Sequence, residues 1–337
     1  MTGLEHIYSN QELLHSGLRL ELGPYGCMVL LDHRQVHSSE HKRYDTVAAY
    51  LGSRGVPSIE DALSELPLVE IHGSLNDIID EAFLQEIVRN GEDSTCSTEL
   101  RLQFEERIEP LMAAIKDYFE SDAEYGAFIT AAGDDFECLL THPDVCSSLL
   151  GSDDLDDADL HSRLIFWATG YTWVVLRRLG CLSGNDSWWS VSRSWIDEFR
   201  LSKKIVELFC TVGISSEEGQ GIIDIARILV SQQNWYCEVL DAEKPAQRLR
   251  ELFSDTDVPD YLRVNRYHDV LWFNKERFET LMIWLGCISL LHDSRLRWKD
   301  IERPMSCLIA AADESRYRIV DLIAQLEQAE RKKNERD

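Results

Sequence analysis

The sequence predicts a mainly α-helical protein, a bundle-like array of many helices preceded by a short N-terminal β-hairpin. Two observations predict this class. Apolar residues recur at helical spacing in stretches from residue 40 to residue 330, which is the pattern of helices that bury one face. Strand-like alternation is instead found at residues 18–36, "LRLELGPYGCMVLLDHRQV".

The hairpin is predicted from alternation on both sides of a turn. Leu18, Leu20 and Leu22 alternate with charged residues, Pro24 and its neighbouring glycines favour a turn, and residues 27–31 form an apolar run. An isolated two-stranded hairpin is only marginally stable in water. We therefore expect it to pack either on helices of this chain or on a sheet that this chain lacks.

Capping signals mark several helix starts in the remaining sequence. Ser58 and Asn274 are predicted N-caps, and Ser215 with Glu218 forms an S-x-x-E capping box. The apolar run 164–180 has the length and composition of a buried helix. Further helical stretches are predicted at 40–52, 74–90, 98–120, 192–213 and 307–330. We divide the chain into the hairpin (1–37), a first helical region (38–150) and a second helical region (151–337).

Composition excludes some classes of partner. The 337 residues carry a formal net charge of −26, which disfavours nucleic acid and anionic membrane surfaces. No apolar run approaches the ~20 residues of a membrane span, and the first ten residues do not resemble a secretory signal. The nine cysteines contain no C-x-x-C pair. We therefore expect reduced thiols, no disulfide framework and a cytoplasmic protein.

Motifs that carry chemistry are absent from the sequence. It contains no G-x-S-x-G, G-x-x-x-x-G-K-[ST], G-x-G-x-x-G or H-E-x-x-H. The His-Asp steps at 267–269 and 291–293 lie at predicted helix margins, where Asp caps and His bonds to carbonyls. We predict no catalytic residue, no cofactor-binding residue and no metal ligand.

Two stretches resemble metal-binding motifs but lack features that those motifs require. His33, His37 and His41 are four residues apart, but a strand end and two serines interrupt that stretch, so we expect exposed histidines. The acidic stretch 151–162 lacks the Gly and Glu that a calcium-binding EF-hand loop requires. We expect a solvated loop whose carboxylates cap a helix.

Nine tryptophans raise the question of carbohydrate binding, because flat rings stack on sugars. Trp188 and Trp189, in "GNDSWWSVSRSW", are predicted to lie in a loop before a helix and are the best placed for a glucan contact. Packing in a core or an interface is the alternative for this pair. A second group of tryptophans is expected in the core: Trp167, Trp173, Trp235, Trp272 and Trp284.

Several segments resemble a known family. "TGLEHIYS" followed by "GLRLELGPYGCMVLLDHRQV" resembles the closing strands of the β-sandwich that follows the catalytic barrel in α-amylase-family glycoside hydrolases. "YLGSRGVPSIEDALSELPLVEIH", "SRSWIDEFRLSKKIVELF" and "VNRYHDVLWFNKERFETLMIWL" are similar, in the same order, to the helical C-terminal extension of large bacterial members of family 13. The similarity covers residues 2 to about 325.

The resemblance implies a function and a missing part. The family's catalytic Asp, Glu and second Asp lie on a (β/α)₈ barrel of ~250 residues, and this chain has no such motifs. The resemblance therefore implies a non-catalytic accessory region that supports a barrel, in cis or in trans, or forms oligomer contacts, or binds α-glucan. The alternatives are a stand-alone helical interaction module, or an enzyme whose helical site is not recognised.

The resemblance also predicts how the N-terminal segment behaves. If the hairpin is the end of a sandwich whose other strands are missing, its apolar residues lack the sheet that would bury them. We therefore expect unusual exposure of Leu18, Leu20, Leu22, Val29 and Leu31.

Overall fold

The fold is described from a computed structural model of the chain. It describes all residues except 1–2, 19, 21, 26, 40–41, 53, 94, 122–123, 143–156, 233–234, 237–243, 293–294 and 335–337. The chain divides into two compact units, Met1–Glu70 and Ile71–Asp337, and each is described by itself. The predicted boundary at residue 150 lies outside the described residues, and the predicted boundary at residue 37 stays a prediction.

The first unit has a small core. Its elements are α1 (Asn10–Ser16), α2 (Tyr44–Leu51), α3 (Ile59–Glu65) and the 3₁₀ helix η1 (Leu66–Leu68). Val47, Leu51 and Ile59 form its buried cluster. An isolated bridge pairs Glu5 with Val56, and the Glu5 carboxylate accepts a hydrogen bond of 2.7 Å from the Ile59 amide. The predicted cap at Ser58 is confirmed, because its hydroxyl accepts from the Asp61 amide at 3.1 Å.

The N-terminal position predicted for the β-hairpin is wrong. The described residues within 18–36 form a turn at Pro24 and Tyr25 but no strand. Alternation of apolar residues fits a strand, but a strand also needs a neighbour for its backbone hydrogen bonds. The predicted exposure is confirmed at five residues: Leu18 (44%), Leu20 (39%), Leu22 (54%), Val29 (71%) and Leu31 (67%).

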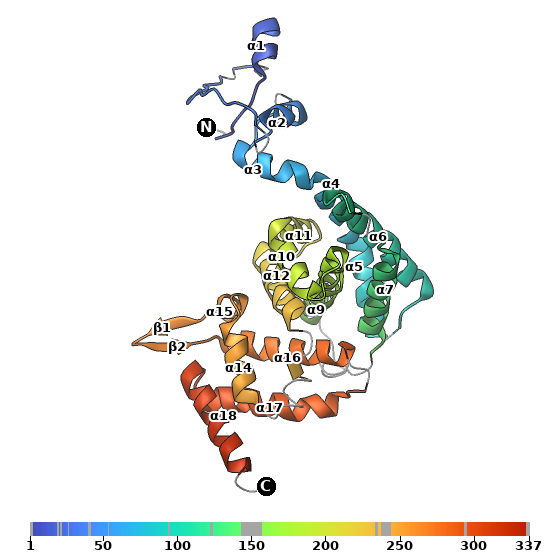
Figure 1. Ribbon diagram of the computed structural model, residues 1–337, viewed down its shortest axis with the longest axis vertical. Coiled ribbons are helices and arrows are strands. Elements are labelled where there is room, and N and C mark those ends of the chain that lie inside the picture. The colour runs from blue at the N-terminus through green and yellow to red at the C-terminus, as the bar shows by residue number, and fades with distance from the viewer. Residues whose placement is uncertain are drawn as a thin grey trace. The chain divides into compact units, whose positions relative to one another are not determined.

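The second unit is an array of helices, and the mainly α fold class is confirmed (Figure 1). The division between the units falls near the start of α4 (Val69–Ile78). The elements that follow are α5 (Glu81–Glu92), α6 (Thr98–Tyr118), α7 (Gly126–Thr141), α9 (Asp157–Arg177), η2 (Leu179–Ser183), α10 (Trp188–Glu198), α11 (Leu201–Thr211), α12 (Ser216–Ser231), α14 (Pro245–Ser254), α15 (Asp257–Tyr261), β1 (Asn265–Tyr267), β2 (Val270–Trp272), α16 (Lys275–His292), α17 (Trp298–Glu314) and α18 (Ile319–Asn334).

Helix α9 is central to this unit, as the sequence predicts for residues 164–180. It packs against α5, α7, α10 and α12 (Figure 1). Its Tyr171 meets Phe83, Phe104 and Phe136 from three other helices, with ring centroids 5.9–6.0 Å from its own. All four rings are buried, and the Tyr171 hydroxyl donates to the Ile78 carbonyl at 2.9 Å. Burial of each ring contributes on the order of 1.5–3 kcal/mol.

A buried ion-pair cluster ties α7 to the end of α9. Asp135 accepts hydrogen bonds from Arg177 at 2.9 Å and from Arg178 at 2.5 Å. Burial lowers the pKa of the Arg177 guanidinium, and the Asp135 carboxylate opposes that effect. Removing one partner of such a pair leaves an uncompensated buried charge. The cluster is therefore part of the packing of this unit.

The β-hairpin of this protein lies at residues 265–272. Strands β1 and β2 are antiparallel, with Asn265 opposite Trp272 and Tyr267 opposite Val270. His268 and Asp269 make the turn, with φ values of 47° and 60°, the geometry of a two-residue type I′ turn. The interpretation of 267–269 as a helix margin is therefore wrong. The Phe273 amide, just past β2, donates to the Tyr317 carbonyl at 3.0 Å.

Three stretches predicted as single helices are broken. Residues 74–90 split between α4 and α5, where the Asp80 side chain caps α5 by accepting from the Phe83 amide at 3.0 Å. Residues 192–213 split between α10 and α11 at Arg200, whose φ is 52°, and residues 307–330 split between α17 and α18 at Arg316 and Tyr317, with φ of 55° and 59°. Arg200, Arg316 and Tyr317 are not the Gly or Asn that usually marks such a break. The sequence therefore carried no signal for these two later breaks.

Two further observations concern the chain as a whole. No helix in the described part of the chain combines the length and apolar content that crossing a membrane requires. No disulfide joins the cysteines that the structure describes.

Candidate functional site

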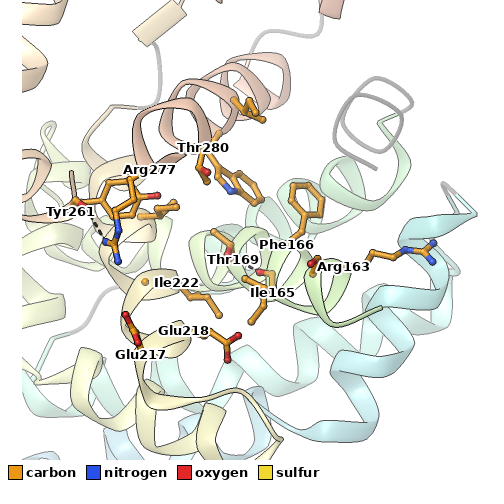
Figure 2. Close-up of a pocket in the computed structure, with 15 residues that line it drawn as sticks. Arg163, Ile165, Phe166, Thr169, Glu217, Glu218, Ile222, Tyr261, Arg277 and Thr280 are labelled. Atoms are coloured by element: carbon orange, nitrogen blue, oxygen red, sulfur yellow. Dashed lines mark hydrogen bonds between the residues drawn. The ribbon is translucent and has the colours of Figure 1, made fainter. Parts of the chain in front are cut away.

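The candidate site is a pocket of about 510 Å³ between four helices of the second unit (Figure 2). We call it the interhelical pocket. Helix α9 contributes Ser162, Arg163, Ile165, Phe166 and Thr169; α12 contributes Glu217, Glu218, Gly221, Ile222 and Ile225; α15 contributes Tyr261; α16 contributes Arg277, Thr280, Ile283 and Trp284. Its volume lies within the ~300–1,000 Å³ typical of small-molecule sites.

The apolar part of the pocket is built from α9, α12 and α16. Phe166 and Trp284 stack with centroids 4.6 Å apart and planes 20° apart. The Thr169 and Thr280 hydroxyls donate to the carbonyls four residues earlier in their own helices, at 2.7 and 2.8 Å. Both hydroxyls are thus satisfied internally, so the pocket keeps an apolar lining beside a few charged groups.

Two glutamates line the pocket from the start of α12. The predicted capping box is confirmed: the Glu218 carboxylate accepts from the Ser215 amide at 2.9 Å and hydroxyl at 2.6 Å. His161 lies 2.8 Å from the same carboxylate. The hydrogen bonds from Ser215 and then from His161 lower the pKa of Glu218 to about 2. Glu217 forms an exposed ion pair with Arg263 at 3.0 Å.

Two arginines lie on different sides of the pocket. In Figure 2, Arg277 lies beside Tyr261, and Arg163 lies on the far side past Phe166. Arg163 is ion-paired with Glu92 at 2.8 Å. Arg277 follows the predicted cap Asn274, which is confirmed because its side chain accepts from the Arg277 amide at 2.9 Å.

Helix α15 holds the Arg277 side chain in place. Its Nη1 donates to the Tyr261 carbonyl at 2.9 Å, and the guanidinium lies 5.2 Å from the centre of the Tyr261 ring. Arg277 has no carboxylate within ion-pairing distance among the residues that the structure describes. Its remaining N–H donors are therefore left for a ligand.

The tryptophan pair proposed for glucan contact lies outside this pocket. Trp188 and Trp189 occupy the first turn of α10, so their predicted place in a loop is wrong. Trp189 is 42% exposed and Trp188 is half-buried, and their rings meet edge to face at 83°. The backbone of Trp188 packs against Gly180, where a Cβ would lie 2.1 Å from the Trp188 carbonyl oxygen. Only Trp189 offers an exposed ring.

The tryptophans predicted for the core are mostly confirmed. Trp167, Trp173, Trp235 and Trp284 are buried. The prediction is wrong for Trp272, which is half-buried in β2.

The stretches that resembled metal sites lie apart from the pocket. His33 and His37 are exposed and lie in no helix, and His41 is outside the described residues. Of the acidic stretch 151–162, residues 151–156 are outside the described residues and α9 begins at Asp157. Among the described side chains, no group of three gathers as a metal site would require.

The pocket itself was not predicted from the sequence. The capping signals identified Asn274, Ser215 and Glu218 as helix-start residues, but not that both helix starts border one cavity. Arg277 carried no signal, because an arginine one turn into a helix is common on any solvated face.

Comparison with known proteins identified no relative of this chain. No family model matches the chain, no curated protein matches it, and no solved structure matches its fold.

Proposed function

We propose that this chain is a non-catalytic accessory region of an α-amylase-like glycoside hydrolase. In this proposal, residues 18–36 attach it, in cis or in trans, to the β-sandwich beside the catalytic barrel. The main support for the proposal is that the alternating apolar side chains of this segment are exposed to solvent. Its similarity to the closing strands of that sandwich suggests the partner.

The backbone of the segment supports the same reading. Outside the turn at Pro24 and Tyr25, no backbone hydrogen bond joins a residue of 18–36 to another residue that the structure describes. Unpaired N–H and C=O groups beside apolar side chains are a template for adding a strand to an existing sheet. Burying one leucine or valine side chain contributes on the order of 1.5–3 kcal/mol. Several such side chains give a partner sheet enough free energy to order this segment.

Two further parts of the proposal concern the cellular compartment and the ligand. Nine cysteines without a C-x-x-C pair favour a reducing compartment, so we propose the cytoplasm. The exposed ring of Trp189 offers an additional contact for α-glucan. Loss of maltoheptaose binding in the Trp188→Ala/Trp189→Ala double variant, measured by calorimetry, is the expected result for this contact.

The attachment is tested with an α-amylase-type protein from the same genome that contains a barrel and a sandwich. Size-exclusion chromatography with light scattering should detect a complex with the 337-residue chain. Leu20→Asp together with Leu22→Asp should weaken the complex more than tenfold, because charges cannot be buried in a sandwich core.

Leu14→Asp is the matched control. Leu14 is an apolar residue with 89% exposure that lies on α1, outside the segment, and its replacement should leave the complex unchanged. Failure of the wild-type chain to bind, or equal weakening by Leu14→Asp, would contradict the proposal.

A stand-alone helical interaction module is the second candidate, and the hairpin β1–β2 favours it. Tyr267 is 65% exposed and its ring meets that of His268 at 4.2 Å, so an aromatic pair is displayed on an extended element. In this case, Tyr267→Ala should abolish binding of a non-glycosidase partner. The Leu20→Asp/Leu22→Asp variant should then bind that partner normally.

A further inference from the structure

We propose that the interhelical pocket binds a small organic carboxylate with an apolar body, and that Arg277 holds its carboxylate group. This inference goes beyond the accessory role proposed above and does not depend on it. It rests on the geometry of Arg277, on the apolar lining and on the sign of the other charges in the pocket.

Arg277 differs from several other buried or half-buried arginines in having no carboxylate in direct contact. Arg163 lies 2.8 Å from Glu92, and Arg177 lies 2.9 Å from Asp135. Other half-buried arginines are paired in the same way: Arg101, Arg178, Arg193 and Arg227. Within the described part of the chain, no carboxylate lies within 4.0 Å of the half-buried Arg277, and Asp224 on α12 acts on it electrostatically only from beyond that distance. A half-buried guanidinium with no carboxylate in direct contact favours an anion from outside the chain.

The guanidinium is oriented before any ligand arrives. The bond from Nη1 to the Tyr261 carbonyl and the stacking over the Tyr261 ring fix one edge. The Nε and Nη2 donors then remain for a two-point contact with a carboxylate, the geometry for which arginine is suited. Fixing the side chain in advance lowers the entropy lost on binding.

The rest of the pocket fits an apolar body. Ile165, Ile222 and Ile283 line it together with the stacked pair of Phe166 and Trp284. In Figure 2, Ile165, Ile222 and Phe166 lie between Arg277 on one side and Arg163 on the other. A ligand anchored at Arg277 would thus lay its body on isoleucine and aromatic side chains.

The glutamates limit the charge of the ligand. Glu217 and Glu218 line the same pocket, and the pKa of about 2 keeps Glu218 ionised at neutral pH. They repel a dianion more strongly than a monoanion. The pocket therefore favours a monocarboxylate over a phosphate ester.

To test this, the full chain is titrated at pH 7 with three probes of similar size. Binding is measured by ligand-observed NMR and by calorimetry. The probes are 3-phenylpropanoate, the uncharged 3-phenylpropan-1-ol and phenyl phosphate. We expect saturable binding of 3-phenylpropanoate, with the alcohol and the phosphate at least tenfold weaker. Absence of saturable 3-phenylpropanoate binding, or equal or tighter binding of either other probe, would overturn the inference.

Two variants locate the binding. Arg277→Gln should weaken 3-phenylpropanoate about tenfold to a hundredfold, the loss expected for hydrogen bonds to a charged group. Gly221→Leu should abolish binding by filling the pocket. Gly221 lines the pocket on α12, and a Cβ there meets nothing within 4 Å, so this variant should fold normally.

Gly73→Leu is the matched control for the second variant. Gly73 is also a helical glycine whose Cβ would meet nothing within 4 Å, but it lies on α4, outside the pocket. Circular dichroism confirms that each variant is folded. If Gly221→Leu binds as wild type does, or if Gly73→Leu loses binding to the same degree, the pocket is not the site.

Discussion

Residues 71–337 bury large aromatic side chains against one another, whereas residues 1–70 leave many of their apolar side chains exposed. The largest fully buried side chains of the described chain all lie in the second unit, among them Trp167, Trp173 and Tyr171. The buried apolar residues described in the first unit are Val47, Leu51, Ile59 and Leu68. Its segment 18–36 instead displays leucines and valines to solvent.

Apolar content alone therefore does not specify a core. A helix can bury one face on other helices of the same chain, and its backbone hydrogen bonds are internal. An extended segment needs a second strand for its backbone as well as a surface for its side chains. The second unit therefore buries its apolar helix faces against one another, whereas segment 18–36 of the first unit leaves apolar side chains exposed.

The largest expected effect is in the aromatic core of the second unit. Phe136→Ala should lower the free energy of unfolding by about 3–5 kcal/mol, because it removes a ring that stacks on Phe104 at 4.5 Å and leaves a cavity. Urea unfolding followed by circular dichroism measures this loss. Leu102→Ala, at a leucine of the same region that is 52% exposed, should change it by less than ~0.5 kcal/mol. Similar losses in both variants would remove the basis of the comparison.

A smaller, local effect is expected in the first unit. Ile59→Ala should destabilise the cluster with Val47 and Leu51 by about 2 kcal/mol, the lower end for such a change, because half-exposed neighbours can close the gap. Hydrogen exchange should speed up in residues 44–66 and stay unchanged in residues 71–337. Faster exchange throughout both units would show that they unfold together.

The smallest expected effect concerns acid stability. The pKa of Glu218 is lowered from 4.5 to about 2 in the folded chain. The ionised carboxylate therefore stabilises the fold above about pH 4.5, and this contribution is lost as the pH falls towards 2. Glu218→Gln should flatten the loss of stability between pH 4.5 and 2, measured by urea unfolding at each pH.

Glu60 in the first unit is the matched control. Hydrogen bonds from Lys42 and then Tyr44 also lower the pKa of Glu60, whose side chain is 53% exposed compared with 38% for Glu218. Glu60→Gln should therefore flatten the same pH profile less than Glu218→Gln does. If Glu60→Gln flattened the profile more than Glu218→Gln, solvent exposure would not explain the difference between the two carboxylates.

Local signals were readable from the sequence, and contacts between distant residues were not. Ser58, Asn274 and the Ser215–Glu218 box act on residues three positions away, and each was predicted correctly. The hairpin was misplaced because the alternation at 18–36 shows the preference of the segment but not whether a neighbouring strand exists. The turn of the true hairpin uses His268 and Asp269 with positive φ, where Asn-Gly or Asp-Gly would have given a signal.

The pocket could not be predicted from the sequence for the same reason. Its residues come from α9, α12, α15 and α16 and are spread over residues 162–284 of the chain. What distinguishes Arg277 is that no carboxylate lies within 4.0 Å of it in the described structure, and no local sequence pattern predicts that. The exposure of residues 18–36, in contrast, followed from a resemblance that implied a missing sheet.

Hydrogen exchange of residues 18–36 tests the central claim most directly. It is measured by mass spectrometry on the 337-residue chain alone and with the barrel-and-sandwich protein. We expect this segment to exchange within seconds in the chain alone, while helix α9 stays protected, and we expect the partner to slow its exchange at least tenfold. Protection of 18–36 in the chain alone, or no change on adding the partner, would contradict the proposed attachment.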